Sequence, residues 1–172
     1  MLKEKIANLI NDQINKELYS GYLYLEFANY CEDLGLDGFA NWYEIQAKEE
    51  RDHAIIFRRY LLDNGFRVTM WAIAEPKVNF KEAMDVFNAG LKHEQYVTSL
   101  INNIYAVAFE EKDYKTMQFL DWFIKEQVEE EKNAEDLIKN MELFGNDAKS
   151  LYLLNQELGG RVYTPTAMLK GE

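Results

Sequence analysis

The residues of this sequence that could do chemistry are glutamates and one histidine that interrupt apolar helical stripes. In the stretch KEERDHAIIF, residues 48–57, Glu50 and His53 are three positions apart. They therefore lie on the same face of a helix as the apolar Phe57. Burying an uncompensated carboxylate costs on the order of several kcal/mol. A helix that turns both side chains toward its own core therefore indicates a site that needs them there.

Three further segments carry the same kind of stripe, apolar at its ends and polar in its middle. Steps that alternate between three and four residues mark the inward face of a helix in a bundle. From the first segment to the last, the predicted inward residues are Ile10, Ile14, Glu17, Gly21, Tyr24 and Ala28; Tyr43, Gln46, Glu50, His53, Phe57 and Tyr60; Phe87, Gly90, Glu94, Val97, Ile101 and Tyr105; and Leu120, Phe123, Gln127, Glu130, Ala134 and Leu137. The polar middles predict one shared site.

The two halves of the chain repeat one another. The first two polar positions are 33 residues apart, the next two are also 33 residues apart, and the second hairpin is offset from the first by 77 residues. That offset aligns Glu17 with Glu94, Glu49 with Glu126, Glu50 with Gln127, and His53 with Glu130. The repeat predicts two matching helical hairpins whose polar residues meet at the same height.

Glutamates that converge on one histidine require cations to balance them, because like charges at one level otherwise force proton uptake. Carboxylate oxygens with one imidazole suit iron or manganese, whereas structural zinc is typically held by thiolates or several histidines. Glu50 is central enough to bridge two metals. In this interpretation Glu17 and His53 complete one coordination sphere, and Glu94 and Glu130 complete the other.

The elements that must position these residues are four long helices and a short fifth, expected at residues 2–33, 38–64, 80–111, 113–143 and 147–158. Asp37 is the expected cap of the second helix, Asn79 and Glu82 form a capping box for the third, and Asn146 or Asp147 caps the fifth. The segment between the second and third helices has no helical period and is long enough to run the height of a bundle. The predicted fold is all-α, a four-helix bundle with a long crossover between helices 2 and 3 and a short fifth C-terminal helix.

Composition bounds the remaining possibilities. At 172 residues, with 48% hydrophobic and 28% charged content, the chain is expected to form a single domain over residues 1–172. Its one cysteine, Cys31, offers no pair for a disulfide or an iron–sulfur cluster. A formal net charge of −11 disfavours nucleic acid and membrane surfaces as partners and favours cations. The N-terminus resembles no signal sequence, so we expect a soluble, cytoplasmic protein.

Four stretches resemble the ferritin family, and specifically the haem-free ferritins of bacteria and archaea. They are NDQINKELYSGYLYLEFANY around Glu17 and Tyr24, DGFANWYEIQAKEERDHA around Glu50 and His53, LKHEQYVTSLI around Glu94, and EEKDYKTMQFLDWFIKEQVEEE around Gln127 and Glu130. The resemblance covers nearly the whole chain. It implies a homo-oligomeric cage of twenty-four identical subunits that oxidises Fe(II) with O2 or H2O2 and stores the product as a ferric oxide mineral.

The resemblance also implies a role for individual residues of the di-iron centre. Glu17, Glu50 and His53 would bind the first iron, and Glu50 would share the second iron with Glu94 and Glu130. Gln127 would lie beside the second iron. An uncharged amide at that position makes the second coordination sphere weaker or more open.

A third iron site is implied as well. Glu49, Glu126 and Glu129 resemble that site in the family, where it shares one glutamate with the di-iron centre and leads toward the interior of the cage. Tyr24 and Trp122 resemble aromatic residues close to the centre. For both aromatic residues, electron donation and ordinary core packing remain open.

Departures from related families argue against haem and against a peroxidase. Haem-containing bacterioferritins carry a second Glu-x-x-His and a haem-ligating methionine directly before the first histidine. Here Gln127 and Glu130 stand at the second motif and Asp52 at the methionine position, so no haem is expected. Cys31 alone cannot supply the four-cysteine module of rubrerythrin-like proteins. Two alternatives to the iron-oxidising cage are a storage shell with slow or no turnover and a helical interaction protein without metal.

Overall fold

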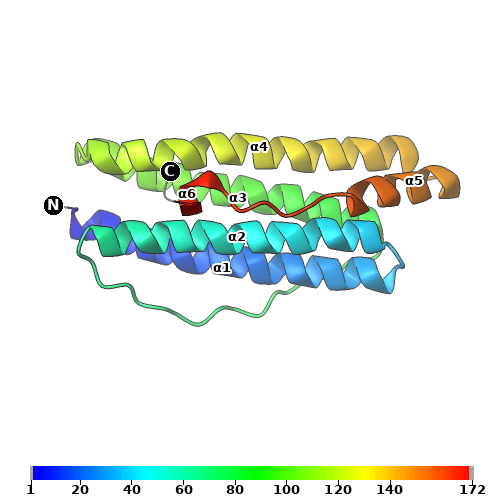
Figure 1. The fold of residues 1–172 in the computed structure, drawn as a ribbon, viewed down its shortest axis with the longest axis horizontal. Helices are drawn as coiled ribbons and strands as arrows, with labels where there is room; N and C mark the ends of the chain where they lie inside the picture. Colours follow the sequence, from blue (N-terminus) through cyan, green and yellow to red (C-terminus); the bar gives the residue numbers. More distant parts are fainter. Residues whose placement is uncertain (1, 171–172) are drawn as a thin grey trace.

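The computed structural model describes residues 2–170, and no strand occurs among them. Its helices are α1 (Glu4–Asp33), α2 (Asp37–Asp63), α3 (Ala83–Glu110), α4 (Tyr114–Phe144), α5 (Ala148–Gly159) and α6 (Ala167–Lys170) (Figure 1). The first four lie side by side as a bundle, and α5 packs against the end of the bundle where α2 begins. The predicted all-α four-helix bundle with a short fifth helix is confirmed, whereas α6 was not predicted.

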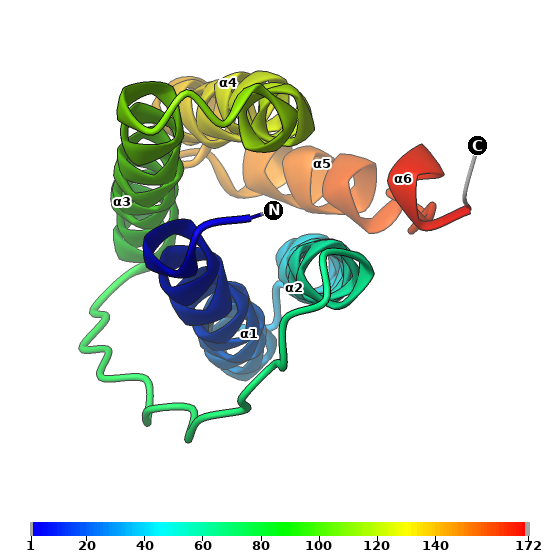
Figure 2. The same cartoon turned by 90° about the vertical axis from the view of Figure 1, so that its left-hand side faces the viewer.

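The connection between α2 and α3 runs the length of the bundle. It covers residues 64–82 and lies on the side of α1, away from α4 (Figure 2). Because it crosses from one end to the other, α3 runs parallel to α2, as the sequence predicts. The single-domain prediction for residues 1–172 is untested, and positions 1, 171 and 172 lie outside the described residues. Within residues 2–170, none of the helices combines the length and apolarity needed to cross a membrane.

Two apolar clusters form the core, one toward each end of the bundle. The first surrounds the stacked rings of Phe57 and Phe123, whose centroids are 4.0 Å apart. The second surrounds the edge-to-face pair Tyr24 and Phe27. Between the clusters lie the buried polar residues that interrupt the stripes, which we call the polar belt: Glu17, Gln46, Glu50, His53, Glu94, Gln127 and Glu130. Each helix therefore has enough apolar contact on both sides of this belt to hold its polar residues in place.

Two stripe positions are less buried than the sequence predicts. Tyr105 is only half-buried, and its hydroxyl donates a hydrogen bond to Asp121. The neighbouring Ile104 and Ala108 face the core instead. Ala134 is also half-buried. An ideal helix drifts relative to a seven-residue repeat, which explains why the inward face has moved from Tyr105 to Ile104 and Ala108 near the end of α3.

The prediction that Asp37 caps α2 is wrong, because Asp37 belongs to the first turn of that helix. The cap comes from α5, where Asn155 Oδ1 accepts hydrogen bonds from the backbone N–H groups of Gly38 (2.9 Å) and Phe39 (3.2 Å). Gly38 is required here, since a Cβ atom would lie 1.7 Å from the carbonyl oxygen of Asn155. The same contact therefore caps the start of α2 and holds α5 against it.

The capping box that was predicted for the third helix is displaced by three residues. Asp85 Oδ2, rather than Glu82, accepts hydrogen bonds from the backbone ahead of the helix, at 2.8 Å from Lys81 N and 3.3 Å from Glu82 N. The helix begins at Ala83 and not at residue 80. Asp147 caps α5 by accepting from Ser150 N at 2.8 Å, which is one of the two predicted alternatives.

Helices α1 and α2 approach each other closely beside the polar belt. A Cβ atom on Gly21 would lie 3.0 Å from the carbonyl oxygen of Ala47 and 3.5 Å from Glu50 Cβ. The missing side chain therefore lets the two helix backbones come together. This contact lies one turn from Glu17 and one turn from Glu50.

Candidate metal centre

All four long helices contribute to the polar belt. Exposed fractions run from 0% for Glu17 to 6% for Glu130. Helix α1 supplies Glu17, α2 supplies Glu50 and His53, α3 supplies Glu94, and α4 supplies Gln127 and Glu130. Acidic side chains are almost never buried this completely unless they are paired or bind a cation.

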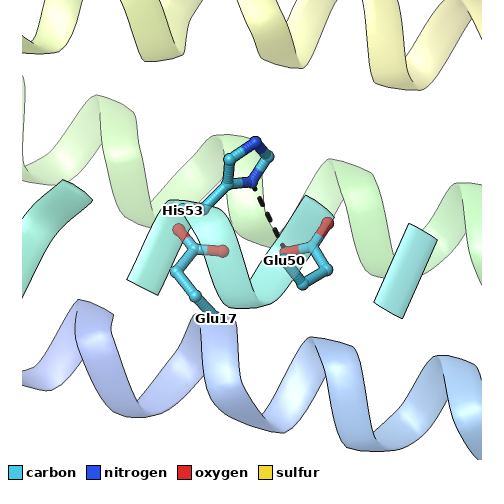
Figure 3. Close-up of side chains that lie close together, drawn as sticks. All are labelled: Glu17, Glu50 and His53. Carbon is cyan, nitrogen blue, oxygen red and sulfur yellow. Dashed lines mark ion pairs between the residues drawn. The ribbon is translucent and has the colours of Figure 1, made fainter. Parts of the chain in front are cut away.

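Glu17, Glu50 and His53 form the tightest group. One potential ligand atom from each lies within 4.8 Å of the other two, and the three side chains point toward one another (Figure 3). His53 Nδ1 is 3.7 Å from Glu50 Oε2. The imidazole is oriented by its edge-to-face contact with the ring of Trp122, at 5.6 Å between centroids. Trp122 thus packs directly against the candidate ligand set.

The two carboxylates on the other hairpin are each held by hydrogen bonds. Glu94 accepts one from the hydroxyl of Tyr24 and one from Gln127 Nε2, at 3.2 Å. Glu130 Oε2 accepts a hydrogen bond from Gln46 Nε2 at 2.8 Å. Helices α1, α2 and α4 therefore all contribute donors that aim these carboxylates into the belt.

Burial raises the pKa of every carboxyl group in the belt. Desolvation, followed by the charge of Glu50, raises the pKa of Glu17 well above its usual range. Desolvation and the charges of Glu94 and Glu130 do the same for Glu50. The pKa of Glu130 rises to about 8, chiefly through burial and then through Glu94. In the absence of cations Glu130 therefore holds a proton at neutral pH, and burial favours the neutral form of the other carboxyl groups.

Three buried oxygens of the belt make no hydrogen bond within the described part of the chain. They are Glu17 Oε2, Glu50 Oε2 and Gln46 Oε1. Buried polar atoms are normally satisfied, so such atoms indicate a missing partner. A partner shared by two carboxylate oxygens and close to an imidazole has the chemistry of a cation. The residues therefore fit a metal ion.

The residues of the predicted third site are more open. Glu129 is exposed and Glu126 is half-buried. Desolvation raises the pKa of Glu126, and the charges of Glu129 and Glu49 raise it further while His53 lowers it. Glu49 is already engaged, because its Oε2 accepts a hydrogen bond from Arg161 Nη2 at 2.7 Å.

Several residues around the belt were not predicted to take part. Gln13 Nε2 donates to Glu17 Oε1 at 2.8 Å, one helical turn earlier on α1. Ser20 Oγ lies 2.8 Å from Nε2 of the half-buried His93, whose ring packs edge-on against Tyr24. In the sequence, a glutamine one helical turn before the inward-facing Glu17 was a usable signal for Gln13. The contacts of Ser20 and His93 join different helices and leave no local sequence pattern.

Comparisons with known proteins identify relatives of this chain. A family model described as a ferritin-like domain matches residues 7–144. A bacterial non-heme ferritin from Staphylococcus haemolyticus is 40% identical over 163 residues, which are 95% of this chain and 98% of that protein. A bacterial non-heme ferritin from Staphylococcus aureus (strain USA300) is 38% identical with the same coverage.

Solved structures give the same result in three dimensions. An engineered closed form of the Archaeoglobus fulgidus ferritin has a TM-score of 0.93 and 39% identity, and the match covers 95% of this chain and all of that one. An open-pore ferritin from the same archaeon has a TM-score of 0.92 and 38% identity, covering 94% of this chain and 100% of that chain. Since the family model spans most of the chain and the relatives align over nearly their whole lengths, the chain belongs to the ferritin family.

Proposed function

We propose that this protein stores iron and oxidises Fe(II) to Fe(III) at the polar belt of each subunit. The observation that carries the proposal is the pair of buried, unsatisfied carboxylate oxygens, Glu17 Oε2 and Glu50 Oε2, next to His53. Iron is the substrate and cargo. The names of the curated relatives, bacterial non-heme ferritins, support iron storage as the function.

Two Fe(II) ions would bind side by side in the belt. Glu17, Glu50 and His53 would hold the first ion, and Glu50 would share the second with Glu94 and Glu130. Gln127 donates to Glu94 and so restricts where that carboxylate points. A carboxylate-rich site with a single imidazole binds iron weakly enough to release the oxidised product.

The electrons and protons of this reaction balance without any further cofactor. Each Fe(II) gives up one electron. Two electrons and two protons convert O2 to H2O2, and with H2O2 as the oxidant the same number breaks the O–O bond and yields two waters. Because burial raises the pKa of Glu130 to about 8, a cation that binds there at neutral pH would release the proton of this group.

Storage requires an enclosed space, which we propose to be a cage of twenty-four subunits. Support comes from the solved relatives, which are a closed form and an open-pore form of a ferritin. Native mass spectrometry of the purified protein measures the assembly directly. A monomer or dimer as the only species would contradict the cage.

Aerobic addition of Fe(II) to the metal-free protein tests the oxidation, followed by absorbance of Fe(III). We expect Glu50→Ala to reduce the initial rate to that of buffer, since Glu50 contacts both proposed ions. Folding should remain intact because the change removes a buried charge. Glu44→Ala, an exposed position on the same helix, is the matched control and should keep the wild-type rate.

The same assay addresses the alternative of a storage shell with slow or no turnover. Gln127, an amide where the repeat places a glutamate, favours that alternative because it weakens the second coordination sphere. Wild-type protein that binds two cations per subunit yet oxidises Fe(II) no faster than Glu50→Ala would establish the alternative and refute the ferroxidase proposal.

A further inference from the structure

The chain after α5 turns back and runs along the bundle. The extended residues 160–166 lie over the face of α2 between α2 and α4, and they end in α6 beside α2 (Figure 1). Figure 2 shows the same segment on the opposite side of the bundle from the long crossover. We call residues 160–170 the C-terminal strap. Its course takes it to Glu49, one of the residues of the predicted third site.

Arg161 is the most heavily bonded side chain of the strap. Its Nη2 donates to Glu49 Oε2 at 2.7 Å, and its Nη1 donates to the carbonyl oxygen of Trp42 at 3.3 Å. The guanidinium also lies over the ring of Trp42, with Cζ 4.0 Å from the ring centroid. Stacking and hydrogen bonding together hold the guanidinium in one place.

Other contacts fix the strap on the same face of α2. Asn41 Nδ2 donates to the carbonyl oxygen of Arg161 at 3.1 Å. Tyr163 donates its hydroxyl to the buried Asp52 at 2.6 Å. Arg59 Nη1 donates to the carbonyl oxygen of Leu169 at 2.9 Å. The strap is therefore anchored along more than four turns of α2, and Arg161 is not a freely moving surface residue.

Glu49 contacts the strap through Arg161 and also belongs to the predicted third cation site. It precedes the ligand candidate Glu50, and its charge raises the pKa of Glu126 on α4. The side chains of Glu49 and Arg161 are only 24% and 20% exposed, so their attraction is screened less than that of a surface pair. Arg161 thus supplies the positive charge that a cation at Glu49 would otherwise supply.

We propose that Arg161 is a tethered competitor for the third cation site, so that a cation bound at Glu49 and a strap anchored through Arg161 exclude one another. The inference rests on the proposed function, because it takes Glu49, Glu126 and Glu129 as the ligands of that site. A cation next to Glu49 repels the guanidinium and takes its acceptor oxygen. By thermodynamic linkage, the anchored strap lowers the affinity of the site for the cation by the same factor by which the bound cation weakens the contact between Arg161 and Glu49.

Calorimetric titration of the metal-free, fully assembled protein with Zn²⁺, which does not change oxidation state, tests the competition. Wild type should bind two ions tightly in the belt and a third weakly. Arg161→Gln should tighten the third ion at least about fivefold, the lower end of usual coupling between sites, and leave the first two unchanged. Arg161→Lys, which keeps the charge, should fall between the two. Arg58→Gln removes an exposed arginine of α2 and should match wild type.

Hydrogen exchange measured by mass spectrometry supplies a second readout that does not depend on affinity. Backbone amides of residues 160–169 should exchange faster once Zn²⁺ fills the third site, and Glu49→Gln should accelerate them without any metal. Protection that is the same with and without the third ion would overturn the proposal. An unchanged third affinity in Arg161→Gln would overturn it as well.

These outcomes separate this inference from the proposed function. Failure of wild type to bind two ions in the belt, with no loss of binding in Glu50→Ala, would refute the ferroxidase centre. If two ions bind in the belt and the affinity for the third ion is the same in wild type and Arg161→Gln, only the competition is refuted.

Discussion

Replacing Glu130 by glutamine in the metal-free protein is expected to raise its stability at pH 8 and to leave it almost unchanged at pH 5. The pKa of Glu130 is raised from its ordinary value of 4.5 to about 8, first by burial and then by the charge of Glu94. One pKa unit corresponds to about 1.4 kcal/mol. Glutamine has the shape of the protonated acid but does not ionise, so the substitution removes this cost.

The sign follows from proton binding. Between pH 4.5 and 8 the folded state holds a proton on Glu130 that the unfolded chain has lost, so stability falls as pH rises through this window. At pH 8 the cost reaches about 3 to 5 kcal/mol per subunit. For a chain of this length, that free energy corresponds to a rise in the melting temperature of about 6–20 °C.

Thermal unfolding of the metal-free proteins by circular dichroism at pH 5, 6, 7 and 8 measures the effect. Wild type should lose stability steadily over this series, and Glu130→Gln should lose less. Glu142→Gln is the control, since it removes the same charge from an exposed position on α4. The reasoning is refuted if Glu130→Gln is no more stable than wild type at pH 8, or if Glu142→Gln gains as much.

Three further outcomes are expected. Titrating the metal-free protein with Zn²⁺ at pH 6.5, in buffers of different ionisation enthalpy, should reveal at least one proton released per subunit, and Glu50→Gln should reduce that number; no buffer dependence would mean that the belt is already ionised. Tyr24→Phe removes a donor that lowers the pKa of Glu94, so the second Zn²⁺ should bind more weakly, and more so at pH 6 than at pH 7.5; equal affinities at both pH values would contradict this role. Asn155→Ala removes the acceptor that caps α2, and a loss of about 1–2 kcal/mol is expected from denaturant midpoints, with faster hydrogen exchange in α5; unchanged exchange in α5 would show that this contact does not dock it.

Periodicity was sufficient to predict which residues of each helix face the core near its middle. Glu17, Glu50 and Glu94 were placed inward on spacing alone, and all are almost fully buried. The reason is geometric, because a helix repeats every 3.6 residues and an error of register accumulates slowly. The assignment of individual residues to individual metal ions stays a prediction.

Contacts between distant segments could not be predicted in the same way. Asn155 caps α2 from a position 117 residues later in the chain, which is why Asp37 was wrongly chosen as the cap. Gln46 was placed on the inward face, but its hydrogen bond to Glu130 depends on how α2 and α4 are packed. Periodicity gives the direction of a side chain, whereas a partner also requires the angle and distance between helices.

The course of the C-terminal strap, residues 160–170, could not be predicted from the sequence either. Arg161 and Tyr163 lie in an extended segment without helical period, and nothing in GGRVYTPT specifies the surface on which it docks. Its partners, Glu49 and Asp52, were interpreted only through the metal chemistry of their own helix. An ion pair between segments 112 residues apart depends on the completed fold.

The absence of a side chain at Gly21 has a consequence for which metals the belt can hold. A Cβ atom on Gly21 would lie 3.0 Å from the carbonyl oxygen of Ala47, so a larger residue would push α1 and α2 apart at this level. Wider spacing of the two backbones would also move the Glu17 and Glu50 side chains apart. A glycine that binds no ion at all therefore helps to set how large a cation these two carboxylates can share.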